Sequence, residues 1–600
     1  MAAAPPSEHQ AGTSEARPPT RRLLAIAALA CFWVLLFGLY IYEASWLPPW
    51  PASTPEEDAF ISFRFADNLA EGYGPVFNRG GRAVEGYTNF LWVAWLAALH
   101  RQWPDTVLHA LWSGFALGFL VLPAAWLLAR RVAGRWAWGV PVVLALSRYH
   151  TENALTGLET VAYNLLFLVA LLLFADVLEG APGRRRQHAT AATSVLLVLL
   201  AMTRFEGVYL FPLLSLFWGW RRWRDGESPL RDWGWYAPFL ALYGAYTGWR
   251  VLTFGELLPN TYYAKLLVTG TGVAKLASGL AHVGDFLLAY PALPLLVIAF
   301  ALALPPRRWR PFHTVLVAAI TTQLGLVAFI GGDWSYLAPY WRLLSTVAPL
   351  FLVLGAACLQ QLLSERRRWA ALLLLGTCLL LSAFRVGTLA PAPAGGHPQA
   401  PARPSLQAAL SRLALLPREL GPRLGRLLAF ADTNPERKVG LRLGEQLGPA
   451  GRVVGQHAGR IPYYSRLEFV DIIGYTDRQT NRLLWDPARG SFDPARWPLV
   501  WEHLLGLSPD LLLILPKADS PAAFAPLAAA LDAHGYCLAN ALRSPSARLG
   551  FLTFEPCSSV PPPAQGCTDT VDLGGRPYPL CPQQVVDLDA LATAPRDRDP

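Results

Sequence analysis

Residues 57–90 read EDAFISFRFADNLAEGYGPVFNRGGRAVEGYTNF, a polar segment that follows the apolar run at 23–42. It combines acids, arginines and aromatic residues with five glycines. The surrounding chain of 600 residues is 53% hydrophobic and only 16% charged. Apolar runs of about 20 residues, enough to cross a bilayer, recur as far as about residue 387. The composition therefore predicts a polytopic α-helical membrane protein whose first crossing is followed by a polar loop.

The run LLAIAALACFWVLLFGLYIY at 23–42 is too long for the core of a cleavable signal, and no small-x-small cleavage site follows it. We expect it to be retained as the first crossing. Short arginine clusters separate the later runs, and the positive-inside rule places them in the cytoplasm. Because the clusters do not form one continuous face, topology explains the net charge of +9 better than nucleic-acid binding does. The clusters are Arg17, Arg21 and Arg22; Arg130, Arg131 and Arg135; Arg184, Arg185 and Arg186; Arg221, Arg222 and Arg224; Arg307, Arg308 and Arg310; Arg366, Arg367 and Arg368.

The apolar stretch YTNFLWVAWLAALH at 87–100 is the ambiguous element of this topology. If it crossed the bilayer, the cluster at 130–135 would lie outside and every later cluster would be inverted. We therefore interpret it as an interfacial or re-entrant helix of the first outer loop, residues 44–107. This leaves about 11 crossings, with the amino terminus inside and the carboxyl terminus outside.

The chain divides into a cytoplasmic tail at 1–22, a transmembrane catalytic domain at 23–388, a linker at 389–428 and a soluble domain at 429–600. The linker is rich in Pro, Ala and Gly. Alternating apolar segments after it predict strands and helices of an α/β domain. Its cysteines, Cys537, Cys557, Cys567 and Cys581, allow two disulfides in three pairings. A metal site is less favoured because no CxxC pair is present.

Polar residues gather at the outer edges of the predicted crossings, where ionisable groups usually mark function or ion pairing. A carboxylate in the first loop can act as a general base, bind a divalent cation, or pair with an arginine. Lys265 is an outward cation that closely follows Tyr262 and Tyr263, and it is suited to a phosphate. One hypothesis covers these features: glycosyl transfer from a lipid-linked phosphate donor to a hydrophilic acceptor. The chain has no Walker loop, no dinucleotide fingerprint and no HExxH motif.

The string EDAFISFRFADNLAEGYGPVFN...VEGYTNFLW resembles the first-loop signature DDAYISFRYAxNLAxGxGxVxN...VEGYTNxLW of GT-C fold membrane glycosyltransferases similar to the mycobacterial terminal beta-(1->2) arabinofuranosyltransferase. The resemblance continues, in order, through GLET, RFEG, LPNTYYAK and GGDW, and through AGRIPYYSRLEFVDIIGYTDR at 458–478. It implies a GT-C transmembrane domain with about 11 helices and a carboxy-terminal periplasmic α/β domain. It also implies a bacterial plasma-membrane location, with the site facing the periplasm.

The resemblance further implies an inverting transfer from a polyprenyl-phosphate sugar, with the first-loop aspartate, here Asp58, as the base. Glu57 takes the place of the family's first acid, and the pair would hold a divalent cation if one is bound. RFEG and GGDWS depart from the common RPEG and GGDWM. Adjacent carboxylates raise each other's pKa, so an ionised Asp58 calls for a nearby cation.

The expected site residues fall into two groups. The donor phosphate and lipid are assigned to Asn260, Tyr262, Lys265, Arg64, Arg204 and Arg342. The sugar and the glycan acceptor are assigned to Glu85, Tyr87, Asn89, Glu159, Glu206, Asp333, Trp334, Tyr463, Tyr464 and Asp471.

Two other classes of function fit parts of this pattern. A transporter or flippase for a lipid-linked sugar would also place charge and aromatic residues at membrane edges, but it predicts repeated halves and polar residues midway through helices. A glycan-binding scaffold would leave the first-loop acids and Lys265 without a role. Within the enzyme class, the relatives suggest arabinofuranose, and the residues do not distinguish it from mannose or another pyranose.

Overall fold

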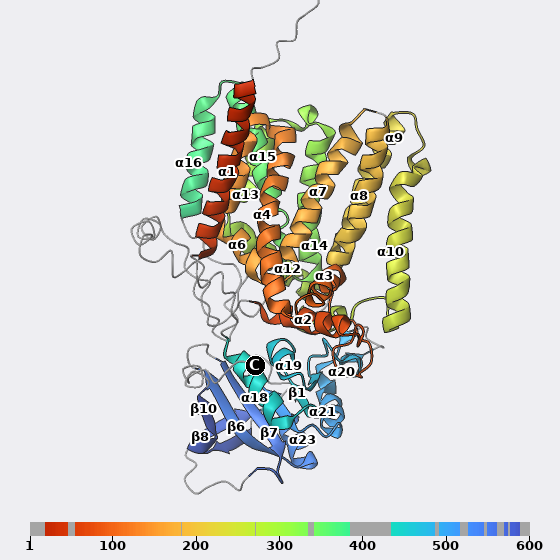
Figure 1. The fold of residues 1–600 in the computed structure, drawn as a ribbon, viewed down its shortest axis with the longest axis vertical. Coiled ribbons are helices and arrows are strands. Elements are labelled where there is room, and N and C mark those ends of the chain that lie inside the picture. Colours follow the sequence, from red (N-terminus) through yellow and green to blue (C-terminus); the bar gives the residue numbers. More distant parts are fainter. Residues whose placement is uncertain are drawn as a thin grey trace, which may run out of the picture.

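A computed structural model describes the chain over residues 19–45, 55–181, 183–269, 272–333, 341–383, 434–486, 491–515, 526–544, 549–560, 569–573 and 576–587. Figure 1 shows a bundle of long helices and, beyond one end of it, a smaller domain that contains the sheet. The helix α2 lies across that end of the bundle, between the two parts. The polar segment at 57–90 is therefore central to the molecule.

The helices of the bundle and its loops follow the apolar runs of the sequence. They are α1 (Pro19–Ser45), α2 (Glu57–Ala70), α3 (Phe90–His100), α4 (Thr106–Ala133), α5 (Gly139–Ala145), α6 (Arg148–Leu155), α7 (Thr160–Glu179), α8 (Arg184–Thr203), α9 (Leu210–Arg224), α10 (Trp233–Phe254), α11 (Asn260–Thr269), α12 (Gly272–Ala289), α13 (Ala292–Ala303), α14 (Pro311–Ile330), α15 (Ala348–Ser364) and α16 (Arg368–Ala383).

Five helical segments of the described chain are long and apolar enough to cross a membrane, or six if the bent pair α12 and α13 forms one span. They are 27–44, 106–145, 160–179, 311–330 and 342–364. Large apolar side chains such as Val34, Leu252 and Phe329 are exposed on the bundle, as lipid-facing residues are. The chain is thus built as a multi-pass membrane protein, and the count of 11 crossings stays a prediction.

The helix α3 has 11 residues, which gives it a length of about 16 Å. This is short of the hydrocarbon thickness of about 30 Å. The bounds agree with the prediction that 87–100 does not cross the membrane. The neighbouring helix α4 begins where the Asp105 side chain accepts a hydrogen bond from the Leu108 amide, 2.9 Å away.

The C-terminal domain has an α/β architecture, as the alternating apolar segments predict. Its six-stranded sheet has the order β10-β6-β7-β5-β1-β2. β1 is parallel to both of its neighbours, whereas β7 is antiparallel to β5 and β6. The elements are α18 (Pro435–Leu447), β1 (Arg452–Gly455), α19 (Arg460–Ser465), β2 (Glu468–Asp471), α20 (Arg478–Leu484), β3 (Trp485–Asp486), β4 (Ser491–Phe492), α21 (Trp497–Gly506), β5 (Leu511–Ile514), α23 (Leu527–His534), β6 (Tyr536–Ser544), β7 (Leu549–Pro556), β8 (Asp569–Leu573), β9 (Arg576–Leu580) and β10 (Val585–Asp587).

A disulfide joins Cys537 in β6 to Cys557 just after β7. Cys581 is also disulfide-bonded, and Cys567 lies outside the described residues. The first pair is one of the pairings that the sequence allows.

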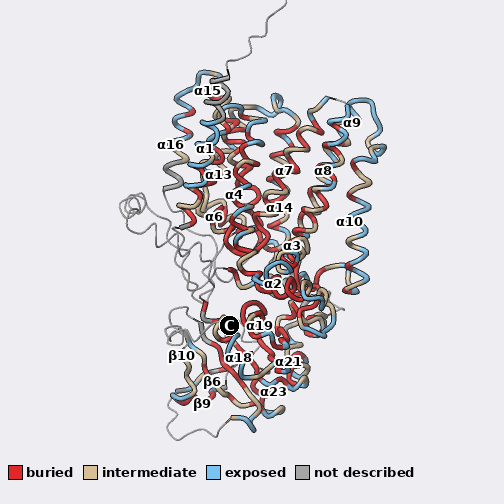
Figure 2. Tube along the Cα trace, viewed as in Figure 1, coloured by how far each residue is buried: buried red, intermediate tan, exposed pale blue. Residues whose placement is uncertain are grey.

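One hydrophobic cluster joins the first loop to the C-terminal domain. It includes Phe60 and Phe63 of α2 together with Ile461 and Tyr463 of α19. The Phe60 and Tyr463 rings are 5.4 Å apart. Figure 2 shows buried residues running from the bundle through α2 to α19. The buried apolar contact fixes α2 against both parts of the molecule.

Candidate active site

The amino terminus of α2 carries two adjacent acids with different surroundings. Successive residues of an α-helix are about 100° apart around its axis, so Glu57 and Asp58 do not share a face. The Asp58 side chain is 55% exposed and lies near Arg342. Glu57 instead accepts backbone hydrogen bonds from the C-terminal domain. The structure therefore separates the two acids that the sequence analysis pairs for a cation.

Asp58 lines a pocket of about 580 Å³, which we call the α2 pocket. Its walls come from α2, from the loop before α3, from the end of the bundle and from the C-terminal domain. Six residues selected from the sequence line it: Asp58, Tyr87, Asn89, Glu159, Arg204 and Arg342. The other lining residues are Ile61, Ser62, Gly86, Thr88, Leu158, Thr261 and Tyr475.

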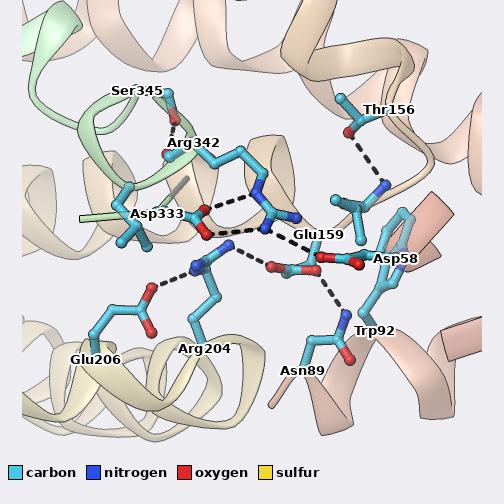
Figure 3. Close-up of polar contacts among 12 residues, drawn as sticks. Asp58, Asn89, Trp92, Thr156, Glu159, Arg204, Glu206, Asp333, Arg342 and Ser345 are labelled. Carbon is cyan, nitrogen blue, oxygen red and sulfur yellow. Dashed lines mark hydrogen bonds and ion pairs between the residues drawn. The ribbon is translucent and has the colours of Figure 1, made fainter. Parts of the chain in front are cut away.

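Arg342 is the cation beside Asp58 (Figure 3). Its Nη2 lies 3.6 Å from Oδ2 of Asp58, and its Nη1 lies 3.6 Å from Oε2 of Glu56. Two of its N–H groups donate to Asp333, at 2.8 and 3.2 Å. The guanidinium is thus oriented by Asp333 and presents its remaining edge to Asp58.

Arg204 forms the second guanidinium centre of the pocket (Figure 3). It directly follows α8 and pairs with Glu159 and Glu206, each at 2.5 Å. The second oxygen of Glu159 accepts a hydrogen bond from Asn89, at 2.7 Å. Ser62 of α2 is hydrogen-bonded to Asn89 in turn. These five residues, from four separate parts of the sequence, therefore form one continuous polar network.

The charges of this region are unequal. Within the described part of the chain, the two guanidiniums contact five carboxylates, those of Glu56, Asp58, Glu159, Glu206 and Asp333. Among them, only the Asp58 carboxylate belongs to a side chain that is more than half exposed. Asp58 is thus the carboxylate that a molecule in the pocket reaches most directly.

Glu57 belongs to a second charged group, which we call the junction cluster: Glu57, Glu436, His457 and Arg460. One Glu57 oxygen accepts hydrogen bonds from the amides of Gly459 and Arg460, at 3.0 and 2.9 Å. The Arg460 guanidinium lies 3.2 Å from Glu57 and 3.5 Å from Glu436. His457 contacts Glu436 at 3.0 Å.

Burial and the nearby Glu436 charge raise the pKa of Glu57 to about 8. Burial would also raise the pKa of Glu436, but His457 and Arg460 lower it to about 2. Near neutral pH the pair of carboxyl groups therefore holds one proton, and this proton lies on Glu57.

The oxygens of Glu57 and Glu436 and a ring nitrogen of His457 lie within 4.8 Å of one another, a set that can hold a metal ion. However, the Arg460 guanidinium already lies against both carboxylates and would repel a cation. Arg460 thus supplies the positive charge that the sequence analysis expects near the acid pair, on the Glu57 side.

Several other expected site residues lie away from the α2 pocket. Arg64 is 3% exposed and donates to the carbonyls of Phe77, Pro462 and Leu467 and to the Asn78 side chain. Its N–H groups are used to hold the first loop against the C-terminal domain. Arg64 is not among the residues that line the α2 pocket.

Glu85, Tyr463 and Tyr464 are also placed in packing roles. Glu85 accepts two hydrogen bonds from Arg250 of α10. The Tyr463 and Tyr464 rings lie 5.4 and 5.7 Å from the Phe60 ring. These aromatic residues therefore join the two parts of the molecule and do not line the pocket.

Asp471 and Asn260 shape the loop that carries Tyr475. Asp471 accepts hydrogen bonds from the amides of Ile473 and Tyr475, at 3.0 and 2.6 Å. Burial nevertheless raises its pKa to about 6. Asn260 donates to the carbonyls of Gly474 and Tyr475. Both residues thus hold the loop that carries the pocket residue Tyr475, and neither lines the pocket itself.

Tyr262 is 39% exposed at the start of α11. Lys265 lies in the same helix, and its side chain is outside the described part of the structure. Trp334 also lies outside it.

The sequence analysis did not select Glu56, Thr261, Arg460 or Tyr475. Three of them lie inside motifs it quotes: Thr261 in LPNTYYAK, and Arg460 and Tyr475 in the 458–478 segment. Residue type alone did not single them out, because a threonine or a tyrosine in a motif is as often structural as functional.

Comparisons with known proteins support a glycosyltransferase relationship. Residues 428–557 match a family model described as a domain of unknown function (DUF8728). Over 343 residues the chain is 27% identical to the terminal beta-(1->2)-arabinofuranosyltransferase of Mycobacterium tuberculosis, a match that covers 53% of this chain and 51% of that protein. The chain thus spans about half the length of this curated relative.

In structure, the chain is similar to ArnT from Cupriavidus metallidurans bound to undecaprenyl phosphate, with a TM-score of 0.54 and 14% identity over 90% of this chain and 100% of ArnT. The apo state of ArnT matches with a TM-score of 0.50, also at 14% identity, over 90% of this chain and 100% of that one. At this identity the likeness concerns the fold alone. The chain is thus similar in sequence to a membrane arabinofuranosyltransferase, and it has the GT-C fold that its first-loop motif predicts.

Proposed function

We propose that this protein is an inverting GT-C glycosyltransferase that moves a sugar from a polyprenyl phosphate to a glycan acceptor, with Asp58 as the general base. The observation that carries the proposal is the exposed Asp58 carboxylate in the α2 pocket, 3.6 Å from a guanidinium that Asp333 orients. The sequence relative and the fold support the same reaction class.

The proposed reaction needs one proton acceptor and one leaving group. Asp58 takes the proton of an acceptor hydroxyl, and the hydroxyl oxygen attacks the anomeric carbon from the face opposite the phosphate. The bond from the anomeric carbon to the phosphate oxygen breaks, and the polyprenyl phosphate leaves with the electron pair. Arg342 and Arg204 are the guanidiniums placed to stabilise that phosphate.

The charge balance of the pocket makes a further demand on the donor site. Since the two arginines are already matched by five carboxylates, a phosphate entering the pocket needs additional positive charge. Our candidate for this positive charge is Lys265 of α11, which lies four residues, or about one helical turn, after the pocket residue Thr261. A divalent cation held at the pocket carboxylates is the alternative source.

We further propose arabinofuranose as the donor sugar and the periplasmic face as the location of the pocket. The sugar rests on the 27% identical relative, and the location rests on the arginine clusters of the sequence. A flippase is the competing function, and it would move the lipid-linked sugar without forming a glycosidic bond.

The test is an assay of purified protein in detergent with a panel of polyprenyl-phosphate sugars and an oligosaccharide acceptor. We expect transfer with inversion at the anomeric carbon, seen by NMR of the product, and no turnover with nucleotide sugars. Full turnover by Asp58→Asn would remove Asp58 as the base. Transport of the lipid-linked sugar in vesicles without any product would favour the flippase. Labelling of Asp58→Cys in membranes from the cytoplasmic side only would overturn the periplasmic location.

A further inference from the structure

The α2 pocket has an uncharged side that the proposed reaction does not use. Thr261 is the second residue of α11, is 8% exposed and lines the pocket. Its buried hydroxyl oxygen makes no hydrogen bond within the described residues. A buried hydroxyl without a partner destabilises the protein, so a ligand that supplies a partner recovers this energy.

Three buried threonines of the bundle show the contrast, whereas the Thr160 hydroxyl, like that of Thr261, has no hydrogen-bond partner within the described residues. Thr190, Thr193 and Thr203 each donate to a carbonyl four residues earlier in the chain, at 2.7 Å. Thr261 has no such partner, because the residue four positions before it precedes α11. Thr261 thus combines a place in the pocket lining with a hydroxyl that no described residue pairs.

Tyr475 of the C-terminal domain lines the same pocket. Its backbone is fixed from both sides: Asp471 accepts from its amide, and Asn260 donates to its carbonyl. Asn481 donates to Asn260 in turn, at 3.1 Å. Asn260 and Thr261 are adjacent in α11. The helix that holds the Tyr475 loop therefore also carries the Thr261 hydroxyl, which has no partner within the described residues.

Gly86 explains how closely this loop approaches the first loop. A Cβ at Gly86 would lie 3.1 Å from the Tyr475 carbonyl oxygen and 3.0 Å from the Phe65 ring. Both distances are tight, so a side chain at this position would push the Tyr475 loop away from the pocket. The position of Tyr475 is thus set by three separate segments of the chain.

From these observations we propose that Thr261 and Tyr475 form a subsite for a sugar hydroxyl in the α2 pocket. The inference rests on the proposed function and names the part of the pocket that selects its sugar. A neutral hydroxyl pairs with the Thr261 hydroxyl, and the Tyr475 side chain supplies an aromatic wall with a polar end. The charged side, Asp58 with Arg204 and Arg342, is left for the proton and the phosphate.

The subsite is tested by binding, so that the result does not depend on turnover. The probes are polyprenyl-phosphate arabinofuranose, the same lipid phosphate without a sugar, and an arabinofuranosyl oligosaccharide acceptor. Thr261→Val removes the hydroxyl at constant shape, and Thr261→Ser is the matched control that keeps it. We expect Thr261→Val to weaken a sugar-bearing probe about 3–10-fold, the value of one hydrogen bond, and Thr261→Ser to bind like the wild type.

The three probes distinguish the possible results. Weakening of the lipid-linked sugar alone assigns the subsite to the donor, and weakening of the oligosaccharide alone assigns it to the acceptor. Bare polyprenyl phosphate should bind equally to all variants. Equal weakening of all three probes, or none of any, would overturn the subsite.

Tyr475→Ala provides a second variant, and it should weaken the same sugar-bearing probe as Thr261→Val. Its thermal denaturation is compared with that of the wild type to establish that it is folded. Weakening of a different probe would separate Tyr475 from the subsite. Sugar-dependent binding that Thr261→Val weakens, in a wild-type protein that transfers nothing, would retain the subsite and remove the proposed transferase function.

Discussion

The α2 pocket and the junction cluster begin at neighbouring residues of one helix, yet they treat a carboxylate in opposite ways. Asp58 is 55% exposed and has one guanidinium edge beside it. Glu57 is 15% exposed, accepts hydrogen bonds from two backbone amides and lies against the fully buried guanidinium of Arg460. A carboxylate that works on a substrate needs room, whereas one that joins two domains needs partners on every side. On this comparison we propose chemistry for Asp58 and assembly for Glu57.

The largest expected effect tests this division directly. Asp58→Asn should lower turnover about 10²–10⁴-fold, the usual contribution of a general base, with little change in thermal stability because the side chain is half exposed. Glu57→Gln is the matched variant one residue earlier and should keep turnover of the wild-type order, because Gln resembles the protonated side chain. Steady-state rates with the preferred donor check both. Equal losses in the two variants would remove the distinction between the acids.

The next effect concerns the stability of the junction cluster. Arg460→Met leaves Glu57 and Glu436 without their shared guanidinium, and breaking a buried ion pair costs about 3–5 kcal/mol. Arg482→Met is the matched control, because Arg482 pairs with Glu256 across the same boundary but is 64% exposed, and Arg478 stays beside Glu256. We expect the control to cost about 1 kcal/mol or less. Thermal denaturation in detergent, followed by the signal of the C-terminal domain, measures both, and a larger loss for Arg482→Met would contradict the assignment.

The smallest effect is a dependence of stability on pH. In the folded protein Glu57 keeps its proton up to about pH 8, whereas its ordinary pKa is 4.5. The folded state therefore holds a proton between these values that the unfolded chain has released, so stability falls as pH rises from 4.5 to 8. Below pH 4.5 the Glu436 carboxylate, with its pKa lowered to about 2, acts in the opposite direction.

Since the release of one proton changes stability by at most about 1.4 kcal/mol per pH unit, we expect the free energy of unfolding to decrease between pH 4.5 and 8 with a slope no steeper than this. Glu57→Gln cannot release a proton and should remove this slope. Denaturation curves of the two proteins across the window provide the measurement. A slope that survives in Glu57→Gln would assign the shared proton elsewhere.

The sequence predicts much of the fold because its signals are local. Apolar runs, arginine clusters and the motif order indicate the helical bundle, the short α3 and the α/β domain. The same motifs select Asp58, Asn89, Glu159, Arg204 and Arg342, which the structure brings together in one pocket. Each of these belongs to a short signature that is recognisable without its neighbours in space.

The remaining positions depend on contacts between distant parts of the chain. Arg64 resembles a phosphate ligand in the sequence, but its acceptors include carbonyls 398 and 403 residues away. Tyr463 was expected at a glycan and instead packs on Phe60. The orientation of the Glu57 side chain depends on Arg460 and Glu436, which lie about 400 and 380 residues later in the chain. No local sequence pattern shows which polar groups already form hydrogen bonds or ion pairs with residues from a distant part of the chain.

The bond between Arg64 and the C-terminal domain has a consequence for biosynthesis. A chain is made from its amino terminus, and its domains generally fold in that order. The carbonyls of Pro462 and Leu467 that accept from Arg64 are therefore among the last parts to be made. Until they arrive, the Arg64 guanidinium has only its acceptors within the first loop, the Phe77 carbonyl and the Asn78 side chain, and the wall containing Tyr475 is missing. The α2 pocket is thus incomplete on the nascent bundle, and under the proposed function no transfer can begin until the segment that contains Tyr475 has been delivered to the side of the membrane where α2 lies.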